Sequence, residues 1–347
     1  MKESIESIPT FTIIIPVTHS LENLEWCLAS LDHLDYPKDR FHVVLVDCHV
    51  VAGLKEFVAT MPRHEFRCSA LSLPERFLRS PSWLHEIRVN EARNYAIQRF
   101  LGQCYVFTED DCAFESDWLH KIEANLADDV GALGGPEILP EGMGWFPRAL
   151  DCLLNSFLGT AGSRRGDGLK EDWYYPRKVN MAIPTHVLDR IGLFPEEVTS
   201  AADVEIAKRI RDVGFQIRFL PDNPVWHRRV TTFRNFVRRN AYTASEKVEL
   251  LRQKQSFTRS LHFLILVATL MVAVIGLLSL VSNVARILLV ALSGVYLLAL
   301  VSTAVGSAIR TRSITVGLGV LVLMPIHQLS ISFGVIKGVV SKLKIGT

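Results

Sequence analysis

The stretch Val106-Phe107-Thr108-Glu109-Asp110-Asp111-Cys112 places three carboxylates directly after an apolar run that is typical of a buried β-strand. Adjacent carboxylates repel one another, and a hard divalent cation such as Mg²⁺ or Mn²⁺ relieves that repulsion by binding to oxygen. In α/β sheets, ligands bind at the carboxyl ends of the strands. The stretch therefore predicts a metal and diphosphate site at a strand end. The alternative is an acidic turn that caps the helix expected from about residue 116.

Apolar runs and helical patterns alternate around this stretch. Strands are expected at residues 11–17, 41–46, 66–73, 104–108 and 131–133, and helices at 21–34, 53–61, 85–101, 118–126 and 204–213. This alternation predicts an α/β fold with a mostly parallel sheet. Asp47 also ends a strand and should lie at the same edge as the carboxylate stretch. Asp203 begins the last of these helices, where an aspartate is often only a cap.

Charge is distributed unevenly along the 347 residues. Residues 259–347 contain no Asp or Glu and only seven basic residues. Residues 1–258 carry 31 basic against 36 acidic residues, a net charge of −5. An acidic N-terminal part argues against nucleic acid as the main partner, because nucleic-acid-binding domains are usually basic. Residues 1–10 contain no long apolar run, so no cleaved signal peptide is expected.

The C-terminal part is expected to be a membrane domain with two or three transmembrane helices. Residues 261–281 and 287–305 contain almost only apolar residues and no Asp, Glu, Lys or Arg except at their borders, and about 20 apolar residues span a bilayer core. Buried core helices are the alternative reading of these two runs. A third segment, residues 314–340, includes Pro325, His327 and Gln328. It is expected either to span the membrane or to dip in and return.

Basic residues predict the orientation of this membrane domain. Four lie between residues 247 and 259, before the first run, and Arg310 and Arg312 follow the second, whereas only Arg286 lies between them. By the positive-inside rule, the N-terminal domain is expected on the cytoplasmic face of the cell membrane. Three lysines between residues 337 and 344 would also prefer the cytoplasm, which conflicts with a full third crossing.

The segment 231–250 mixes aromatic and aliphatic residues with arginines. It is predicted to form an amphipathic helix at the membrane surface, in contact with lipids. Arg238 and Arg239 could instead grip a diphosphate or a lipid phosphate, since arginine suits phosphate geometry. A solvated basic face is the third possibility.

Eight short motifs follow one another in a recognisable order: IIIPV (13–17), VLVDC (44–48), ARNYAI (92–97), VFTEDDC (106–112) with DWL (117–119), GALGGP (131–136), NMAI (180–183), ADVEIAKRIRDVG (202–214) and VWH (225–227). With this set, the chain resembles the family 2 glycosyltransferases of the GT-A fold, in particular the membrane-anchored bacterial and archaeal members, over about residues 9–245. The resemblance implies a GT-A catalytic domain over residues 1–230, an interfacial linker over 231–258 and a membrane domain over 259–347.

The resemblance also implies roles for individual residues. Glu109-Asp110-Asp111 matches the family's DXD metal motif, with Glu in place of the first Asp. Asp111 and Glu109, with His227, are the implied ligands of Mg²⁺ or Mn²⁺. Asp203 is the implied general base, although the glutamate that precedes it in the family is Ala202 here. The implied donor-binding residues are Pro16, Asp47, Arg93, Asn94, Asp110, Gly134, Gly135, Arg238 and Arg239.

The implied activity is metal-dependent, inverting transfer of one sugar from a nucleotide-diphosphate sugar to a hydroxyl or phosphate of an acceptor. The membrane tail favours a polyprenyl-linked or other lipid-linked acceptor, and residues 142–178, including Trp173, are expected to hold the acceptor loop. The QxxRW motif of processive members is missing, which argues against polymer synthesis. An inactive scaffold with the same fold is one alternative, and Glu109 and Ala202 favour it. A nucleotidyltransferase is another, but residues 13–20 offer no lysine or arginine for a triphosphate.

Overall fold

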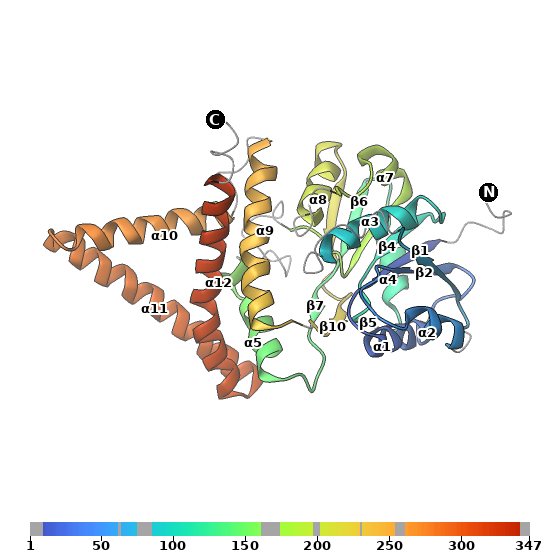
Figure 1. The fold of residues 1–347 in the computed structure, drawn as a ribbon, viewed down its shortest axis with the longest axis horizontal. Coiled ribbons are helices and arrows are strands. Elements are labelled where there is room, and N and C mark those ends of the chain that lie inside the picture. The colour runs from blue at the N-terminus through green and yellow to red at the C-terminus, as the bar shows by residue number, and fades with distance from the viewer. Residues whose placement is uncertain are drawn as a thin grey trace. The chain divides into compact units, whose positions relative to one another are not determined.

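The computed structural model describes residues 10–61, 64–74, 85–160, 174–196, 202–229, 231–253 and 261–340. The chain forms two compact units, the first from Met1–Pro140 with Arg164–Val230 and the second from Glu141–Ser163 with Thr231–Thr347. Figure 1 shows the elements of both units. The segment Glu141–Ser163 belongs to the same unit as the C-terminal helices, although it lies in the first half of the sequence.

The first unit is built on a seven-stranded sheet with the order β3-β2-β1-β4-β8-β6-β9. Its strands are β1 (Phe11–Val17), β2 (Phe41–Asp47), β3 (Arg67–Ser72), β4 (Cys104–Phe107), β6 (Val130–Gly134), β8 (Met181–Pro184) and β9 (Gln216–Phe219). The pairs among β1 to β4 are parallel, as is β6 with β9, whereas β8 runs antiparallel to both of its neighbours. The sheet is therefore mixed but mostly parallel, as the alternation of strands and helices predicts.

Helices cover both faces of this sheet. They are α1 (Leu21–Asp32), α2 (Leu54–Thr60) and α4 (Trp118–Asn125) on one face, and α3 (His85–Ile97), α7 (Thr185–Ile191) and α8 (Ala202–Asp212) on the other. Ile13 and Ile15 of β1 join the core with α1, α2 and α4, whereas Ile14 joins the core with α3, α7 and α8. Because successive side chains of a strand face opposite sides, a strand buried on both faces is apolar throughout.

A small second sheet lies within the same unit, with the order β5-β10-β7. Its strands are β5 (Cys112–Phe114), β7 (Glu137–Ile138) and β10 (Val225–His227). Strand β10 is antiparallel to β5 and parallel to β7. The pairing places His227 opposite Cys112, so a residue late in the unit lies next to the carboxylate stretch.

The second unit is entirely helical in its described residues. Its helices are α5 (Trp145–Leu154), α6 (Phe157–Thr160), α9 (Phe233–Gln253), α10 (Leu261–Leu278), α11 (Asn283–Thr311) and α12 (Ile314–Val340). Helix α12 contacts α5, α9, α10 and α11. A core of apolar side chains from α5, α9, α11 and α12 includes Leu153, Phe236 and Met324.

Helices α9 and α12 lie side by side at close range (Figure 1). A Cβ atom on Gly334 would lie 2.0 Å from the carbonyl oxygen of Ala241, and one on Gly338 would lie 2.9 Å from that of Ser245. Phe236 of α9 is buried as well. The helix predicted for residues 231–250 is thus present, but its buried face packs against α12.

Two of the described helices, α11 and α12, are long and apolar enough to cross a membrane. Half of the apolar stretch of α12 is buried inside the structure, whereas only 11% of that of α11 is buried. Helix α12 continues through Pro325 as a single helix, so the described segment does not bend back on itself. In α10 the described apolar part is the shorter Val267–Leu278. Two such helices are a weak indication of membrane association.

Candidate active site

The carboxyl ends of the parallel strands β1, β2 and β4 lie at one edge of the main sheet. Val17 pairs with Asp47 and Ile14 with Phe107, so the residues that follow these strands gather at this edge. The stretch Thr108–Asp111 leaves β4 here and leads into β5. Because ligands bind at this edge in α/β sheets, the residues gathered here form the candidate active site.

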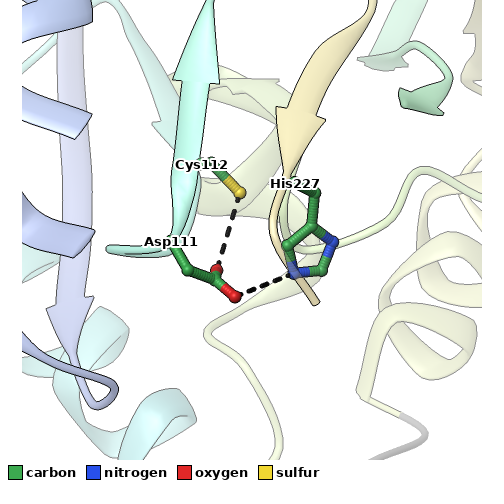
Figure 2. Close-up of side chains that lie close together, drawn as sticks. All are labelled: Asp111, Cys112 and His227. Carbon is green, nitrogen blue, oxygen red and sulfur yellow. Dashed lines mark hydrogen bonds and ion pairs between the residues drawn. The ribbon is translucent and has the colours of Figure 1, made fainter. Parts of the chain in front are cut away.

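Figure 2 shows three side chains that meet at this edge: Asp111, Cys112 and His227. His227 Nε2 lies 3.3 Å from Asp111 Oδ2. The Cys112 thiol donates to Asp111 Oδ1 at 3.9 Å. Asp111 is fully buried, and its Oδ2 accepts no hydrogen bond of good geometry from the described residues. Buried polar atoms are normally paired, so a carboxylate oxygen left in this state is a candidate cation ligand.

The charges of these groups depend on one another. Burial alone would raise the pKa of Asp111, but His227 and His19 hold it well below its usual range. Burial alone would lower the pKa of His227, but Asp111 and Glu137 raise it to about 9. Burial, together with Asp111, raises the pKa of the Cys112 thiol well above its ordinary value. Because a metal binds the thiolate, Cys112 is the weakest candidate ligand of the three. A cation bound here would also displace the proton that the two carboxylates favour on His227.

Asp110 faces the loop that follows β1. Its Oδ2 accepts hydrogen bonds from the main-chain amides of Thr18 and His19 at 3.1 and 2.8 Å. Its Oδ1 lies 2.7 Å from His19 Nδ1, while His19 Nε2 lies 3.8 Å from Asp111 Oδ2. The sequence alone did not mark His19 as a site residue. The signal that could have done so is its place directly after β1, at the edge where β4 also ends.

Glu109, the first residue of the DXD-like motif, faces two cations. Its Oε1 lies 3.7 Å from Lys178 Nζ and 3.9 Å from Arg93 Nη2. Burial alone would raise the pKa of Glu109, yet Lys178 holds it below its ordinary value. Of the three residues predicted to bind metal, the structure therefore brings Asp111 and His227 together and turns Glu109 toward Lys178, which the sequence did not single out.

Asp203 lies in the first turn of α8 and is only 6% exposed. Its Oδ2 accepts a hydrogen bond of 3.4 Å from the main-chain amide of Lys178, and no described residue donates a hydrogen bond to its Oδ1. A capping aspartate would bond the first amides of its own helix. Because Asp203 bonds a residue outside α8, its placement favours the reading as a site residue over that as a helix cap.

Glu137 is a further site residue that the sequence did not mark. Its Oε2 lies 3.0 Å from His227 Nδ1 and 3.1 Å from Arg229 Nη2. Its Oε1 lies 3.6 Å from Arg177 Nε. Two arginines thus lie around one carboxylate close to Asp111. Arginine side chains form strong bonds with anionic ligands such as a diphosphate.

Arg93 and Asn94, predicted to bind the donor, lie inside the core of the first unit. Arg93 is fully buried, with its guanidinium 6.0 Å from the centre of the Phe107 ring and 5.4 Å from that of Phe194. The side chain of Asn94 forms hydrogen bonds of 2.9 Å with both the amide and the carbonyl of Phe194. Both residues therefore order the surroundings of the site, and direct donor binding by them stays a prediction.

Pro16 and Asp47 lie where their strands reach the site edge. Pro16 is buried in β1 and lies beyond Ile14, where the pairing of β1 with β4 ends. Proline has no amide N–H to donate, and at this position β4 does not need one. Asp47 ends β2, and its Oδ1 accepts a hydrogen bond of 2.7 Å from the amide of His49. Donor binding by Pro16 and Asp47 also stays a prediction.

Gly134 and Gly135 allow two main-chain segments to approach closely. A Cβ on Gly135 would lie 2.0 Å from Asn223 O, and one on Gly134 would lie 2.7 Å from Asn180 O. The Asn180 side chain donates to the same Asn223 oxygen at 2.9 Å and accepts from Trp118 Nε1 at 3.1 Å. The NMAI and DWL motifs are thus joined by packing. This packing explains the glycines without a ligand, and their predicted contact with the donor remains untested.

Arg238 and Arg239 lie in α9 of the second unit, so their contact with a diphosphate stays a prediction. Trp173 lies outside the described residues.

Comparison with known proteins agrees with the fold. No protein-family model matches the chain. Over 220 residues it is 26% identical to Glycosyltransferase AglE of Haloferax volcanii, and the match spans 62% of this chain and just under two thirds, 66%, of that protein. Mannosyltransferase PcManGT from Pyrobaculum calidifontis, solved in complex with GDP-Man and Mn2+, superposes with a TM-score of 0.60 at 18% identity. That match covers 97% of this chain and 88% of the other. The chain is therefore similar in sequence to a glycosyltransferase and shares the GT-A fold of the solved mannosyltransferase.

Proposed function

We propose that this chain is a metal-dependent, inverting glycosyltransferase that moves one sugar from a nucleotide-diphosphate sugar to a lipid-linked acceptor at the cytoplasmic membrane face. The convergence of His227 on the buried Oδ2 of Asp111 carries this proposal. The solved mannosyltransferase with GDP-Man and Mn2+ supports both the donor class and the divalent cation.

Asp111 and His227 are the residues that would hold the cation, Mg²⁺ or Mn²⁺. A carboxylate oxygen and an imidazole nitrogen are common metal ligands. With bonds of about 2.1 Å, two neighbouring ligands of one ion lie roughly 3 Å apart, close to the 3.3 Å between His227 Nε2 and Asp111 Oδ2. When bound, such a cation acts as a Lewis acid that neutralises the charge of the leaving diphosphate.

Arg177 and Arg229, the two arginines beside Glu137, would add positive charge on the donor side. Their fixed, forked donors suit phosphate oxygens, and in a buried setting their attraction to a diphosphate is stronger than in water. These residues would hold the leaving group in place while the bond to the sugar breaks.

Asp203 would act as the general base. Its Oδ1 accepts no hydrogen bond from the described residues, so this oxygen can accept the proton of an acceptor hydroxyl as that hydroxyl attacks the sugar. Such a step is worth about 10²–10⁴ in rate. Attack from the side opposite the diphosphate inverts the anomeric centre. A phosphate acceptor is already ionised and needs no base, so the buried Asp203 favours a hydroxyl acceptor.

The second unit supports a lipid-linked acceptor, such as a glycan on a polyprenyl diphosphate. Helices α11 and α12 have the length and composition of membrane spans, and α11 leaves Ile287, Val290 and Val295 between 69% and 72% exposed. Apolar surface of this kind is stable in contact with lipid. The basic residues that flank the apolar runs favour a catalytic unit on the cytoplasmic side.

Donor turnover tests the proposal. The full chain in detergent is offered UDP-, GDP- and dTDP-sugars with Mn²⁺ or Mg²⁺, with and without a polyprenyl-linked acceptor, and nucleotide release is measured. We expect release from one donor that needs the metal and falls at least about 100-fold in Asp203→Asn. Asp212→Asn is the matched control, because Asp212 ends the same helix, is exposed and is paired with Lys208 on the same helix.

Three outcomes separate the alternatives. Equal loss in Asp203→Asn and Asp212→Asn would indicate damage to α8 rather than loss of a base. Full activity of Asp203→Asn with a hydroxyl acceptor would remove the general-base role. A folded protein that neither binds nor cleaves any donor would favour the inactive scaffold.

A further inference from the structure

His19 and Asp110 form a buried pair beside the proposed metal ligands. Asp110 is fully buried, and both of its oxygens are used on the loop that follows β1, one of them on His19 Nδ1 at 2.7 Å. The amides of Thr18 and His19 fix the same carboxylate. Because Nδ1 of His19 bonds Asp110, the ring nitrogen that could bind a cation is Nε2. This atom lies 3.8 Å from Asp111 Oδ2.

The same arrangement occurs a second time at this oxygen. His227 Nδ1 lies 3.0 Å from Glu137 Oε2, and its Nε2 lies 3.3 Å from Asp111 Oδ2. Histidines that bind metals typically donate their second ring N–H to a carboxylate, which fixes the tautomer and directs the other nitrogen to the metal. Two histidines from different parts of the chain thus direct Nε2 to one buried oxygen, which accepts no hydrogen bond of good geometry from the described residues.

From this geometry we infer that His19 is a further ligand of the divalent cation, so that the site offers two imidazole nitrogens and one carboxylate oxygen. The inference rests on the function proposed above, because it concerns the cation of the same site. The separation of 3.8 Å is somewhat longer than the roughly 3 Å between neighbouring ligands on one ion. His19 and His227 lie in two separate groups of possible ligands that share Asp111. Binding of one ion by both imidazoles therefore needs the two rings to move toward each other as well as toward Asp111.

A site with two imidazole ligands discriminates between cations. Mg²⁺ prefers a shell of oxygen ligands and water, whereas transition ions accept imidazole nitrogen more readily, Mn²⁺ the least of them. The inferred ligand set therefore favours a transition ion over Mg²⁺, with a smaller advantage for Mn²⁺ than for the later transition ions. Loss of His19 should weaken Mn²⁺ binding and bring the affinities for Mn²⁺ and Mg²⁺ closer together.

Counting the nitrogen atoms bound to Mn²⁺ tests the inference without reference to activity. The full chain in detergent, labelled with ¹⁵N-histidine, is loaded with Mn²⁺ in the presence and absence of a nucleoside diphosphate. Pulsed electron paramagnetic resonance then counts the directly bound imidazole nitrogens. We expect two in the wild-type protein and one in each of His19→Gln and His227→Gln. Mn²⁺ affinity should fall in His19→Gln by at least the roughly 10- to 100-fold that loss of an outer-shell partner alone typically costs.

His33→Gln is the matched control, since His33 is an exposed residue just after α1. It should leave both the nitrogen count and the affinity unchanged. One bound nitrogen in the wild type, with unchanged affinity in His19→Gln, would overturn the inference while leaving the proposed function intact. Failure of the wild type to bind Mn²⁺ at all, even with a nucleoside diphosphate, would overturn both. The wild-type count needs no variant, so poor folding of His19→Gln would not spoil the test.

Discussion

Lys178 Nζ lies 3.7 Å from Glu109 Oε1, so the first carboxylate of the DXD-like motif is paired with a fixed cation. The main-chain amide of the same lysine donates to Asp203. Lys178 thus contacts the first carboxylate of the motif through its side chain and the candidate base through its backbone. Because a buried charge needs a partner, Glu109 can serve the site without touching the metal.

This pairing predicts a difference between two carboxylates of one motif. Asp111→Asn should abolish measurable Mn²⁺ binding, because it removes the negative charge from an oxygen that no described residue bonds. Glu109→Gln should lower Mn²⁺ affinity only about 10- to 100-fold, the usual cost of losing an outer-shell partner, since its carboxylate is engaged by Lys178. Mn²⁺ titration followed by electron paramagnetic resonance measures both. Equal losses in the two variants would return Glu109 to the set of ligands.

Gly135→Ala should destabilise the first unit. Its new methyl group would lie 2.0 Å from Asn223 O, which also accepts a hydrogen bond from Asn180. Backbone cannot move aside as a flexible side chain can, so we expect a loss of at least about 2 kcal/mol. The thermal midpoint reports it. Gly144→Ala is the control, since no atom lies within 4 Å of a Cβ there, and a similar drop in both variants would contradict this explanation.

The buried His42 predicts a pH dependence of stability. Burial, with Arg67 on the neighbouring strand, lowers the pKa of His42 from 6.5 to about 4. Between these two values the unfolded chain takes up a proton and the folded chain does not. Stability contributed by this group is therefore present above pH 6.5 and is lost as the pH falls toward 4.

Comparison of wild type with His42→Gln isolates this effect. The wild type should lose more stability than the variant between pH 7 and pH 4.5, by up to about 2 kcal/mol. Thermal midpoints across this range measure the difference, and carboxylates that titrate in both proteins cancel. His33→Gln, at an exposed position, should follow the wild type. Parallel pH profiles of the wild type and His42→Gln would show that His42 titrates normally.

The close approach of α9 to α12 at Gly334 predicts that this position tolerates no side chain. Gly334→Ala would place a methyl group 2.0 Å from Ala241 O and force the two helices apart. We expect a lower thermal midpoint for the second unit in detergent. Gly276→Ala on α10, where a Cβ would meet nothing within 4 Å, should leave the midpoint unaltered. A midpoint unaffected by Gly334→Ala would mean that α9 and α12 do not pack this closely.

The sequence by itself determined the main layers of the first unit. The runs that became β1, β2 and β4 are apolar throughout because both faces of each strand are buried, and that pattern is visible without a structure. The shared sheet edge of the carboxylates after β4 and of Asp47, the last residue of β2, follows from where those strands end. The apolar character of residues 261–340 was equally plain. The short strands β5, β7 and β10, with only two or three residues each, are too brief to show a period.

Only the tertiary structure decided which partner each charged side chain meets. It joined His227 to Asp111 and Glu137, His19 to Asp110, and Glu109 to Lys178. It also turned the buried face of α9 toward α12. Hydrophobic periodicity is a local property that fixes the element to which a residue belongs and the face on which it lies. The pairing of charges depends on distances of a few ångströms between segments far apart in the chain, and those distances exist only once the strands and helices have packed.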